Sequence, residues 1–587
     1  MTGPLASLLK STFGYDGLRG QQQAVIDRVM AGRHTLAVMP TGAGKSLCYQ
    51  LPSVALDGTV LVVSPLIALM HDQLRAAEAV GIRAATLTSV DDDRAATIAR
   101  LRAGELDLLY VAPERASQGG FQTLLAEAKL SLFAIDEAHC ISEYGHDFRP
   151  DYRLLRPLLD RFSAVPRLAL TATADAHTRA DILTQLGIPA DGLVLAGFDR
   201  PNIRYHIAPR ANQAQQLAAL LARYDGPGII YAPTRAATEK LAEKLRTANR
   251  PVACYHAGMS PADRAANQSA FVASEDMVMV ATVAFGMGID KPDVRFVAHA
   301  ALPKSIEGYY QETGRAGRDG DPAFAHLFWN AADFATARMR LSELPPERQA
   351  GERARLDALA ALVETATCRR AVLLRHFGES PPAACGNCDN CLNPPATIAA
   401  SELARKFLSA VYRTGQSYGV GHVEKVLTGQ SDERITARGH DRLSVFGIVE
   451  RAEAALIRPL VRTLTAGDAL RPNEHGGLML GPAARAILRG EQPVDLVEAP
   501  RATGKRDRGS GALNPVGDPL FEALRAERKR LAAEHGVPPY VIFHDSVLRE
   551  MAAERPANIH QMGRINGVGL RKLEDYGEEF LAIISQY

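Results

Sequence analysis

Short apolar runs alternate with amphipathic stretches along the first 200 residues of the chain. The apolar runs are TLAVMP, VLVVSP, LDLLYVAP, LFAIDE and LALTATA. None of them alternates apolar with polar positions, which is the pattern of strands buried on both faces of a parallel sheet. The stretches between them have the length and periodicity of helices, so the pattern predicts an α/β domain.

The same rhythm restarts near residue 205 with GIIYAPTR, VACYHAG, MVMVATVAFGMG and VRFVAHAALP, which predict a second α/β domain. Beyond residue 340 the strand pattern fades into a helical stretch, a cysteine cluster, further helices, and a hairpin around residues 474–477. The predicted fold class is therefore α/β, with two tandem parallel-sheet domains followed by smaller, mainly helical units. The predicted boundaries are 1–204 and 205–340 for the α/β domains, 341–396 for the cysteine module, 397–490 for a helical domain with the hairpin, 491–517 for a linker and 518–587 for a small all-α unit.

Composition narrows the classes of protein that this fold can serve. The chain has 587 residues, with 67 Lys and Arg against 66 Asp and Glu and a net charge of +1. That balance excludes a uniformly basic protein that coats nucleic acid, but it allows a neutral enzyme with a local basic surface. The sequence contains no uninterrupted apolar run of about 18 residues, so it predicts no membrane span. Its first residues lack the pattern of a signal peptide. Seven unevenly spaced cysteines argue against a secreted disulfide scaffold, so we expect a cytoplasmic protein.

The segment MPTGAGKS at residues 39–46 follows a predicted strand and precedes a predicted helix, which is the context of a phosphate-binding loop. Its backbone N–H groups can surround phosphate oxygens, its lysine can reach the β- and γ-phosphates of ATP, and its serine can bind Mg²⁺. The alternative is a plain glycine turn before a helix. The predicted ligands of ATP in this loop are Thr41, Gly42, Gly44, Lys45 and Ser46.

Two further patterns extend the nucleotide site. Asp136 and Glu137 of the segment DEAH stand at the carboxyl end of the run LFAI, where ligands collect in an open α/β sheet. We expect Asp136 to bind Mg²⁺ and Glu137 to orient or deprotonate the attacking water. In the second α/β domain, Arg315 and Arg318 are three residues apart, so a helix would direct both at a γ-phosphate across a domain cleft. Together these patterns predict a nucleoside triphosphatase.

Four cysteines form a C-x16-C-x2-C-x2-C pattern: Cys368, Cys385, Cys388 and Cys391. Four thiolates can close a tetrahedral Zn²⁺ site, and the short spacings suit chelation from one loop. The alternative is an iron–sulfur cluster, since C-x2-C-x2-C also begins a bacterial ferredoxin pattern. The x3-C-P that continues that pattern is missing here, so the spacing predicts a metal site and favours Zn²⁺.

Charge differs between the two C-terminal units. Residues 401–490 carry 13 Lys and Arg against 9 Asp and Glu, whereas residues 518–587 carry 9 basic and 11 acidic side chains. Arginines at 434, 438 and 442 recur every four residues, so one helix would present them on one face to DNA phosphates. The alternative for these three arginines is a solvated face paired with acidic neighbours. His475 at the hairpin tip is a candidate wedge for strand separation, or simply an exposed tip residue. The predicted DNA ligands in this unit are Arg434, Arg438, Arg442 and His475.

The motifs GAGKS, DEAH, TAT, VAFGMGID and QETGRAGR stand in the order that is typical of superfamily 2 helicases. More narrowly, FGYDGLRGQQ, SPLIALMHDQ, AHCISEYGHDFRPDY, FDRPNI and the four cysteines resemble RecQ DNA helicases over about residues 5–490. A unit that resembles the HRDC domain (helicase and RNase D C-terminal) extends the resemblance to about residue 585. It implies two RecA-like motor domains, a zinc-binding module, a winged helix and ATP-dependent unwinding of DNA with 3′–5′ polarity, in recombination, repair, replication restart and the SOS response.

The resemblance also implies roles for individual residues of the nucleotide site. Tyr15 and Arg19 would lie against the purine ring of ATP, and the Gln22 amide would hydrogen-bond to its polar edge. Gly288 and Asp290 match a segment that contacts nucleotide and DNA backbone. Of the two arginines of QETGRAGR, the second, Arg318, is favoured as the arginine finger, with Arg315 beside it. The chain has Gly-Gln at positions 20 and 21 where the family usually has Pro-Gly, which changes the turn before Gln22.

The segment after DEAH resembles the aromatic-rich loop that couples DNA contact to hydrolysis in RecQ helicases. Tyr144, His146, Phe148 and Arg149 suit base stacking and phosphate contact on a single strand. The family usually has Gln-Trp where this chain has Glu143 and Tyr144, so the coupling is expected to be tuned differently. The alternative for Phe148 is a place in the core.

The implied cofactors are ATP, Mg²⁺ on Ser46 and Asp136, and Zn²⁺. The implied partners are single-stranded and duplex DNA, with single-strand DNA-binding protein and other repair proteins as candidates, in a nucleoid-associated, bacterial setting and away from membranes. The last unit could contact single-stranded DNA weakly or dock on a protein. Two rival functions stay open: a superfamily 2 RNA helicase, and a structure-specific DNA-binding or annealing protein in which ATP only switches conformation.

Overall fold

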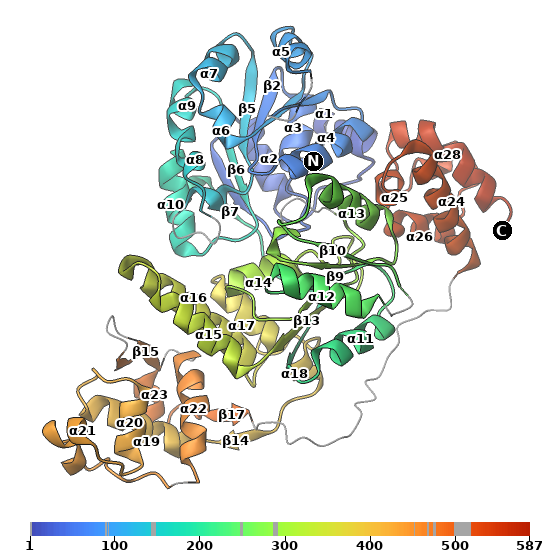
Figure 1. Cartoon of the computed structure of the whole chain (residues 1–587). Coiled ribbons are helices and arrows are strands. Elements are labelled where there is room, and N and C mark those ends of the chain that lie inside the picture. Colours follow the sequence, from blue (N-terminus) through green and yellow to red (C-terminus); the bar gives the residue numbers. More distant parts are fainter. Residues whose placement is uncertain are drawn as a thin grey trace.

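The computed structural model describes residues 3–88, 91, 93–142, 148–246, 250–285, 291–450, 452–466, 469–472, 477–497 and 518–587. Within them the chain forms two parallel sheets with helices around them, a helical module, a mainly helical domain with two short antiparallel strand pairs, and a C-terminal helical unit (Figure 1). This architecture confirms the predicted fold class. None of the described helices is long and apolar enough to cross a membrane.

The first sheet has seven strands in the order β3-β4-β2-β5-β6-β1-β7, all paired in parallel. Alternate residues of one strand belong to two different cores, because Leu36 and Val38 pack on one face of the sheet and Ala37 packs on the other. The strands are β1 (Thr35–Val38), β2 (Thr59–Val63), β3 (Ala84–Leu87), β4 (Leu108–Val111), β5 (Leu130–Ile135), β6 (Arg167–Thr171) and β7 (Leu193–Leu195). The longer helices are α2 (Gln22–Met30), α3 (Leu47–Ala55), α4 (Ile67–Ala79), α5 (Arg94–Arg102), α7 (Gly119–Ala126), α9 (Leu155–Arg161) and α10 (Ala176–Leu186).

The second sheet has six parallel strands in the order β10-β11-β9-β12-β13-β8. Its strands are β8 (Ile203–Pro209), β9 (Gly228–Tyr231), β10 (Val252–Tyr255), β11 (Val278–Ala281), β12 (Phe296–His299) and β13 (Ala323–Trp329). Its helices are α11 (Gln213–Arg223), α12 (Arg235–Leu245), α13 (Pro261–Ala273), α14 (Ile306–Thr313) and α15 (Ala331–Ser342). β8 spans the predicted boundary between residues 204 and 205, and the domain boundaries stay predictions.

The cysteine module joins the second sheet to the winged-helix region. It contains α16 (Pro346–Glu364), α17 (Arg369–His376) and α18 (Asp389–Leu392), and its long helix α16 packs against α22 (Ala454–Ala466), where Glu364 pairs with Arg462. The region beyond contains α19 (Ser401–Arg413), α20 (Val420–Leu427), α21 (Glu433–Ala437), α23 (Ala484–Leu488) and the paired strands β14 (Thr397–Ala399) and β17 (Asp495–Val497). Strands β15 (Leu470–Pro472) and β16 (Leu478–Leu480) pair antiparallel, which confirms the predicted hairpin.

The three regularly spaced arginines do not share a helix, which corrects the sequence prediction. Arg434 lies in α21, but α21 ends before Arg438, and Arg442 lies in a separate 3₁₀ turn. The break occurs at Gly439, whose φ of 69° is in the left-handed region that glycine adopts readily. All three arginines are exposed.

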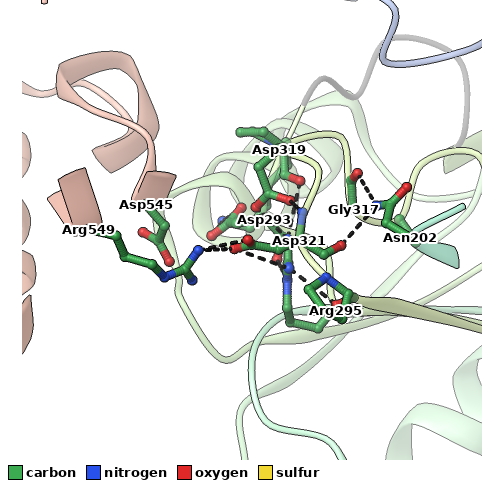
Figure 2. Close-up of polar contacts among 12 residues, drawn as sticks. Asn202, Asp293, Arg295, Gly317, Asp319, Asp321, Asp545 and Arg549 are labelled. Atoms are coloured by element: carbon green, nitrogen blue, oxygen red, sulfur yellow. Dashed lines mark hydrogen bonds and ion pairs between the residues drawn. The ribbon is translucent and has the colours of Figure 1, made fainter. Parts of the chain in front are cut away.

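The C-terminal helical unit contacts both sheet domains. It comprises α24 (Pro519–His535), α25 (Pro539–Ile542), α26 (Asp545–Glu554), α27 (Ile559–Met562) and α28 (Leu570–Ile584) around its own core. The N–H of Gly567 donates to the carbonyl of Gly14 in the first domain at 2.8 Å. Arg528 pairs with Glu275 in the second domain at 2.7 Å, and Figure 2 shows Arg549 directed at Asp321, also at 2.7 Å.

Candidate active site

A cavity of about 450 Å³ lies between the two sheet domains, and the predicted nucleotide ligands gather in it. The first domain contributes the phosphate loop and the DEAH segment, and the second contributes the two arginines. The C-terminal unit adds His544 to its wall. The predicted residues that line this cavity are Tyr15, Thr41, Gly42, Gly44, Lys45, Ser46, Asp136, Glu137, Arg315 and Arg318.

The phosphate loop has the backbone conformation that its glycines allow. Gly42 and Gly44 have φ angles of 84° and 72°, and a side chain at Gly44 would meet the Gln22 amide at 2.5 Å. The Lys45 ammonium donates to the carbonyls of Met39 (3.3 Å) and Pro40 (3.4 Å), so it lies over the loop. The lysine is thus held against the loop that the sequence predicts to bind phosphate.

The DEAH segment follows β5 and is held by buried polar contacts. Glu137 has φ 46° and ψ 45°, a left-handed conformation that costs a non-glycine residue about 1–3 kcal/mol. Tyr152 donates its hydroxyl to the Asp136 carbonyl at 2.8 Å. The His139 ring lies 3.3 Å from the Glu137 carboxylate and 3.0 Å from the Thr171 hydroxyl. These contacts connect the DEAH segment to the TAT segment through one histidine.

The two arginines of the second domain lie in a turn, which corrects the prediction of a helix. Helix α14 ends at Thr313, and the chain then turns through residues 314–319. The turn depends on Gly317, whose φ is 56° and where a Cβ would lie 2.5 Å from the Asn202 amide. Arg315 and Arg318 both reach the cavity from this turn, which we name the arginine turn (residues 314–319).

Of the residues predicted to contact adenine, one lines the cavity and the others lie outside its lining. Tyr15 lines the cavity, whereas Arg19 is exposed and lies outside the cavity lining. Gln22 is buried, and its amide donates to the carbonyls of Ala43 (3.0 Å) and Gly44 (3.1 Å) while its oxygen accepts from the Arg19 N–H (2.8 Å). In this conformation the Gln22 side chain supports the phosphate loop.

The four predicted cysteines form one cluster, with all four sulfur atoms within 4.8 Å of one another. Backbone N–H groups donate to two of the sulfurs, from Ala371 to Cys368 (3.4 Å) and from Cys388 to Cys385 (3.3 Å). Burial raises the pKa of the Cys388 thiol to about 12, and a divalent cation supplies the charge that keeps such a thiol ionised. The donor set and its size fit a tetrahedral Zn²⁺ site.

Comparison with known protein families agrees with this arrangement along the chain. Five family models match, and they follow one another along the chain without overlap. They are the DEAD/DEAH box helicase (residues 19–182), the helicase conserved C-terminal domain (212–320), the RecQ zinc-binding module (331–392), the RQC domain (394–505) and the HRDC domain (518–584).

Curated relatives match over nearly the full length. The ATP-dependent DNA helicase RecQ of Haemophilus influenzae is 43% identical, over 99% of this chain and 96% of its own length. The protein of the same name from Bacillus subtilis is 36% identical, over 99% of this chain and 98% of its own length. The chain belongs to the RecQ family of DNA helicases. Among solved structures, the DUF1998 helicase MrfA bound to DNA and AMPPNP covers 61% of this chain and 57% of its own, with 19% identity and a TM-score of 0.48, and the assignment does not rest on it.

Membership of the RecQ family confirms the predicted enzyme class and its cofactors. The protein is an ATP-dependent DNA helicase that uses ATP with Mg²⁺, and its cysteine cluster fits the Zn²⁺ of the RecQ zinc-binding module. Membership of the family also confirms that the protein binds DNA. The assignment also excludes the iron–sulfur alternative in favour of zinc.

Several predicted RecQ site residues lie outside the described residues: Gly288, Asp290, Tyr144, His146 and His475. Of the aromatic-rich loop, Phe148 and Arg149 are described. The Arg153 guanidinium lies 5.2 Å from the centre of the Phe148 ring, and Arg149 donates to the Pro65 carbonyl at 2.8 Å. Phe148 is half-buried, so it is neither a core residue nor a fully exposed one.

Sequence reasoning missed three residues at this RecQ nucleotide cavity. Lys304 and His544 line it, and Arg200 lies against the phosphate loop. Lys304 stands in no motif that we recognised, and His544 belongs to PPYVIFHD, a segment of the C-terminal unit to which we assigned no role. Arg200 belongs to FDRPNI, which we used for the resemblance without assigning it a role.

Proposed function

We propose that the cavity residues bind and hydrolyse ATP in the roles predicted from the sequence, and that hydrolysis drives unwinding of duplex DNA with 3′–5′ polarity in recombination, repair and replication restart. The observation that carries the proposal is the cavity itself, since the phosphate loop, the DEAH segment and the arginine turn come from two domains and line one space. A site divided between two domains can change its geometry when nucleotide binds and when it is hydrolysed.

Each group has a distinct task in this proposal. The Ser46 hydroxyl and the Asp136 carboxylate would hold Mg²⁺, which would neutralise phosphate charge. The Lys45 ammonium binds the β- and γ-phosphates, and the Glu137 carboxylate orients the attacking water and accepts its proton. Arg318, with Arg315 beside it in the arginine turn, stabilises the charge that develops on the transferred phosphoryl group.

The remaining ligands of the nucleotide and the metal follow the same proposal. Tyr15 stacks on the adenine ring from the wall of the cavity, and Arg19 reaches the ring from the exposed side. Gln22 binds the polar edge of adenine when its amide leaves the phosphate-loop carbonyls. Gly288 and Asp290 contact nucleotide and DNA backbone. The zinc ligands are Cys368, Cys385, Cys388 and Cys391.

For DNA, we propose a path that runs from the aromatic-rich loop to the winged helix. Tyr144, His146, Phe148 and Arg149 contact the single strand. The exposed arginines of the winged helix, separated by the break at Gly439, contact phosphates of the duplex from a bent rather than a straight segment. His475 separates the strands at the hairpin tip. The proposed duplex ligands are Arg434, Arg438, Arg442 and His475.

Unwinding of duplexes with a 3′ or a 5′ single-stranded tail tests the proposal. We expect strand separation with a 3′-tailed DNA duplex and ATP, and none with a non-hydrolysable ATP analogue. Lys45→Ala should abolish ATP hydrolysis and keep part of the DNA affinity, whereas the control Lys129→Ala, at an exposed ion pair with Asp57, should behave as the unchanged protein. Unwinding of RNA but not DNA would identify an RNA helicase. Strand separation that does not require hydrolysable ATP would favour a DNA-binding or annealing protein in which ATP only switches conformation.

We further propose that the protein acts on the nucleoid in the bacterial cytoplasm and binds single-strand DNA-binding protein, because both would occupy the same displaced strand. Bacterial relatives of this length support the setting. Sedimentation of the two purified proteins together, in the absence of DNA, tests the contact directly.

A further inference from the structure

Arg200 lies in the connector between the two sheets, after β7 and before β8. Its guanidinium donates to the carbonyl of Thr41 in the phosphate loop at 2.5 Å. It also donates to three carbonyls of the arginine turn: Gly314 (3.0 Å), Ala316 (3.0 Å) and Gly317 (2.8 Å). One side chain therefore connects the loop that binds phosphate to the turn that carries Arg315 and Arg318.

The two segments that Arg200 connects are in direct contact. A Cβ built on Gly42 would lie 3.4 Å from the Arg200 guanidinium and 3.4 Å from Arg318 Cγ. A Cβ built on Gly314 would lie 3.2 Å from the Thr41 Cβ. A side chain at Gly314 would press against the phosphate loop, so glycine there allows the close approach of the two segments that Arg200 bridges.

The chemistry of arginine suits this position. A guanidinium presents five N–H donors in a rigid plane, so it can serve carbonyls on two sides at once, which a lysine ammonium on a flexible stem does less well. In the described part of the chain, no carboxylate lies within ion-pair distance of Arg200, so peptide carbonyls stabilise its charge. Burial lowers the pKa of the Arg200 guanidinium, which nevertheless stays protonated at neutral pH.

Neighbouring residues of the connector hold the same turn. The Asn202 amide donates to the carbonyls of Gly317 and Asp321, both at 2.8 Å, and Figure 2 shows the first of these contacts. The Tyr310 hydroxyl donates to the Phe198 carbonyl at 2.8 Å. The connector is therefore bonded to the second domain on both sides of Arg200, and Arg200 alone among these contacts reaches across to the phosphate loop.

We propose that Arg200 is a positioning residue for ATP hydrolysis, which places the arginine turn against the phosphate loop and acts through Arg318. The inference rests on the proposed function, since it presupposes that Arg318 stabilises the transferred phosphoryl group. Loss of Arg200 leaves four carbonyls without their shared donor and lets the turn move relative to the loop. A displacement of about 1 Å at a catalytic group can reduce turnover about 100-fold.

Steady-state ATP hydrolysis with DNA present tests the inference. We expect Arg200→Gln to reduce kcat about 10- to 100-fold while KM and the affinity for a non-hydrolysable ATP analogue change little. Arg200→Lys should recover only part of the turnover, because an ammonium cannot bond to both segments in one geometry. The control Arg102→Gln removes an exposed ion pair with Glu127 and should leave kcat unchanged.

A double mutant separates positioning from a general loss of stability. If Arg200 acts through Arg318, adding Arg200→Gln to Arg318→Gln should reduce kcat little further. Normal turnover by Arg200→Gln would overturn the inference. So would a double mutant whose loss of kcat is the product of the two single losses, if Arg200→Gln also lowers the melting temperature. Normal turnover by Arg318→Gln would instead contradict the proposed function, so the two failures are distinguishable.

Discussion

The winged-helix region and the C-terminal helical unit are both appended to the same motor, but they use their arginines differently. The winged-helix region contacts α16 of the zinc module, and Figure 1 shows it at the opposite end of the molecule from the C-terminal unit. Its exposed Arg434, Arg438 and Arg442 form no ion pair within the described residues. The C-terminal unit instead pairs Arg525, Arg528 and Arg549 with carboxylates of the second sheet domain.

This difference adds to what the net charges of the two units show. The charges alone would suggest that the winged-helix region binds DNA strongly and that the C-terminal unit binds it weakly. The C-terminal unit has arginines of its own, yet three of them form ion pairs with Glu275 and Asp321 of the motor. A cation paired inside the protein releases no counterions on meeting a phosphate. From the position of each charge, rather than from the sum, we therefore propose DNA contact for the winged helix, while the C-terminal unit is docked on the motor.

The largest effect should come from the zinc module, which joins the winged helix to the second sheet domain. Replacing the fully buried Cys388 by serine should remove the metal, because a structural Zn²⁺ site of four thiolates contributes on the order of 10 kcal/mol. We expect loss of bound zinc and of unwinding, while hydrogen exchange in residues 518–587 stays as in the unchanged protein. The matched control is Cys254→Ser in β10, a cysteine outside the cluster. Faster exchange across the C-terminal unit would show that the two attachments are not independent.

The second effect concerns Arg528, which is 3% exposed and lies between Glu275 (2.7 Å) and Asp545 (2.6 Å). Arg528→Ala removes the cation between two largely buried carboxylates, of which Glu275 keeps its ion pair with Arg525, and this costs about 3 kcal/mol. We expect faster hydrogen exchange in α24 and α26 and faster proteolysis of the C-terminal unit. Arg530→Ala on the same helix, where the ion pairs are exposed, is the control and should change little.

The same contact predicts a dependence on pH. Burial would raise the pKa of the Asp545 carboxyl, but Arg528 outweighs burial and holds that pKa below its usual range. The stabilisation is then present above the unfolded-state pKa of about 3.9 and is lost as pH falls through the lower folded-state value. Proteolysis of the C-terminal unit that accelerated between pH 7 and 5 would contradict this assignment.

The first sheet and the nucleotide motifs were accessible from the sequence because each is encoded locally. A buried strand followed by GAGKS or DEAH defines its own place at the end of the strand, and the structure brings those residues together. The outer strands were harder to predict. β8 alternates buried and partly exposed positions along IRYHIAP, and its parallel partner β13 lies more than 100 residues further along the chain. The periodicity of a short stretch of sequence does not reveal a pairing between strands that are so far apart in the chain.

Glycines explain the two places where helical spacing misled. Arg315 and Arg318 have the spacing of one helix face, yet Gly317 takes φ 56° and the chain turns there. Gly439 has the same effect between Arg438 and Arg442. Docking of the C-terminal unit left no pattern at all, because it depends on single pairs such as Arg528 with Glu275, which are far apart in the sequence.

The third effect measures DNA contact by the winged helix. Replacing Arg434, Arg438 and Arg442 together by alanine should weaken duplex binding by about 1–3 kcal/mol in total, since each is exposed to solvent and salt. The plot of log K against log salt should become less steep by about 0.9 for each phosphate that the variant no longer neutralises. Fluorescence anisotropy with a labelled duplex at several salt concentrations measures both quantities.

The comparison between the two units supplies the matching control for this experiment. Replacing Arg525 and Arg549 by alanine removes two charges from the C-terminal unit that the motor already neutralises. The salt dependence of duplex binding should then stay unchanged. An equal decrease in slope for both sets of variants would mean that the C-terminal unit binds duplex phosphates, and the assignment of roles would be wrong.

The smallest effect is expected at Arg549 and Asp321, the exposed part of the docking surface in Figure 2. Both Asp321 oxygens accept from the Arg549 guanidinium at 2.7 Å, but the arginine side chain is 49% exposed. A pair of this kind contributes about 0.2–1 kcal/mol and is screened by salt. A double-mutant cycle of Arg549→Ala and Asp321→Asn, read as energy transfer between labels on α26 and α12, should give a coupling in that range that vanishes in about 1 M salt. A coupling that exceeded about 2 kcal/mol, or that resisted salt, would show a desolvated contact, and docking would then be held at this edge as firmly as at the buried Arg528.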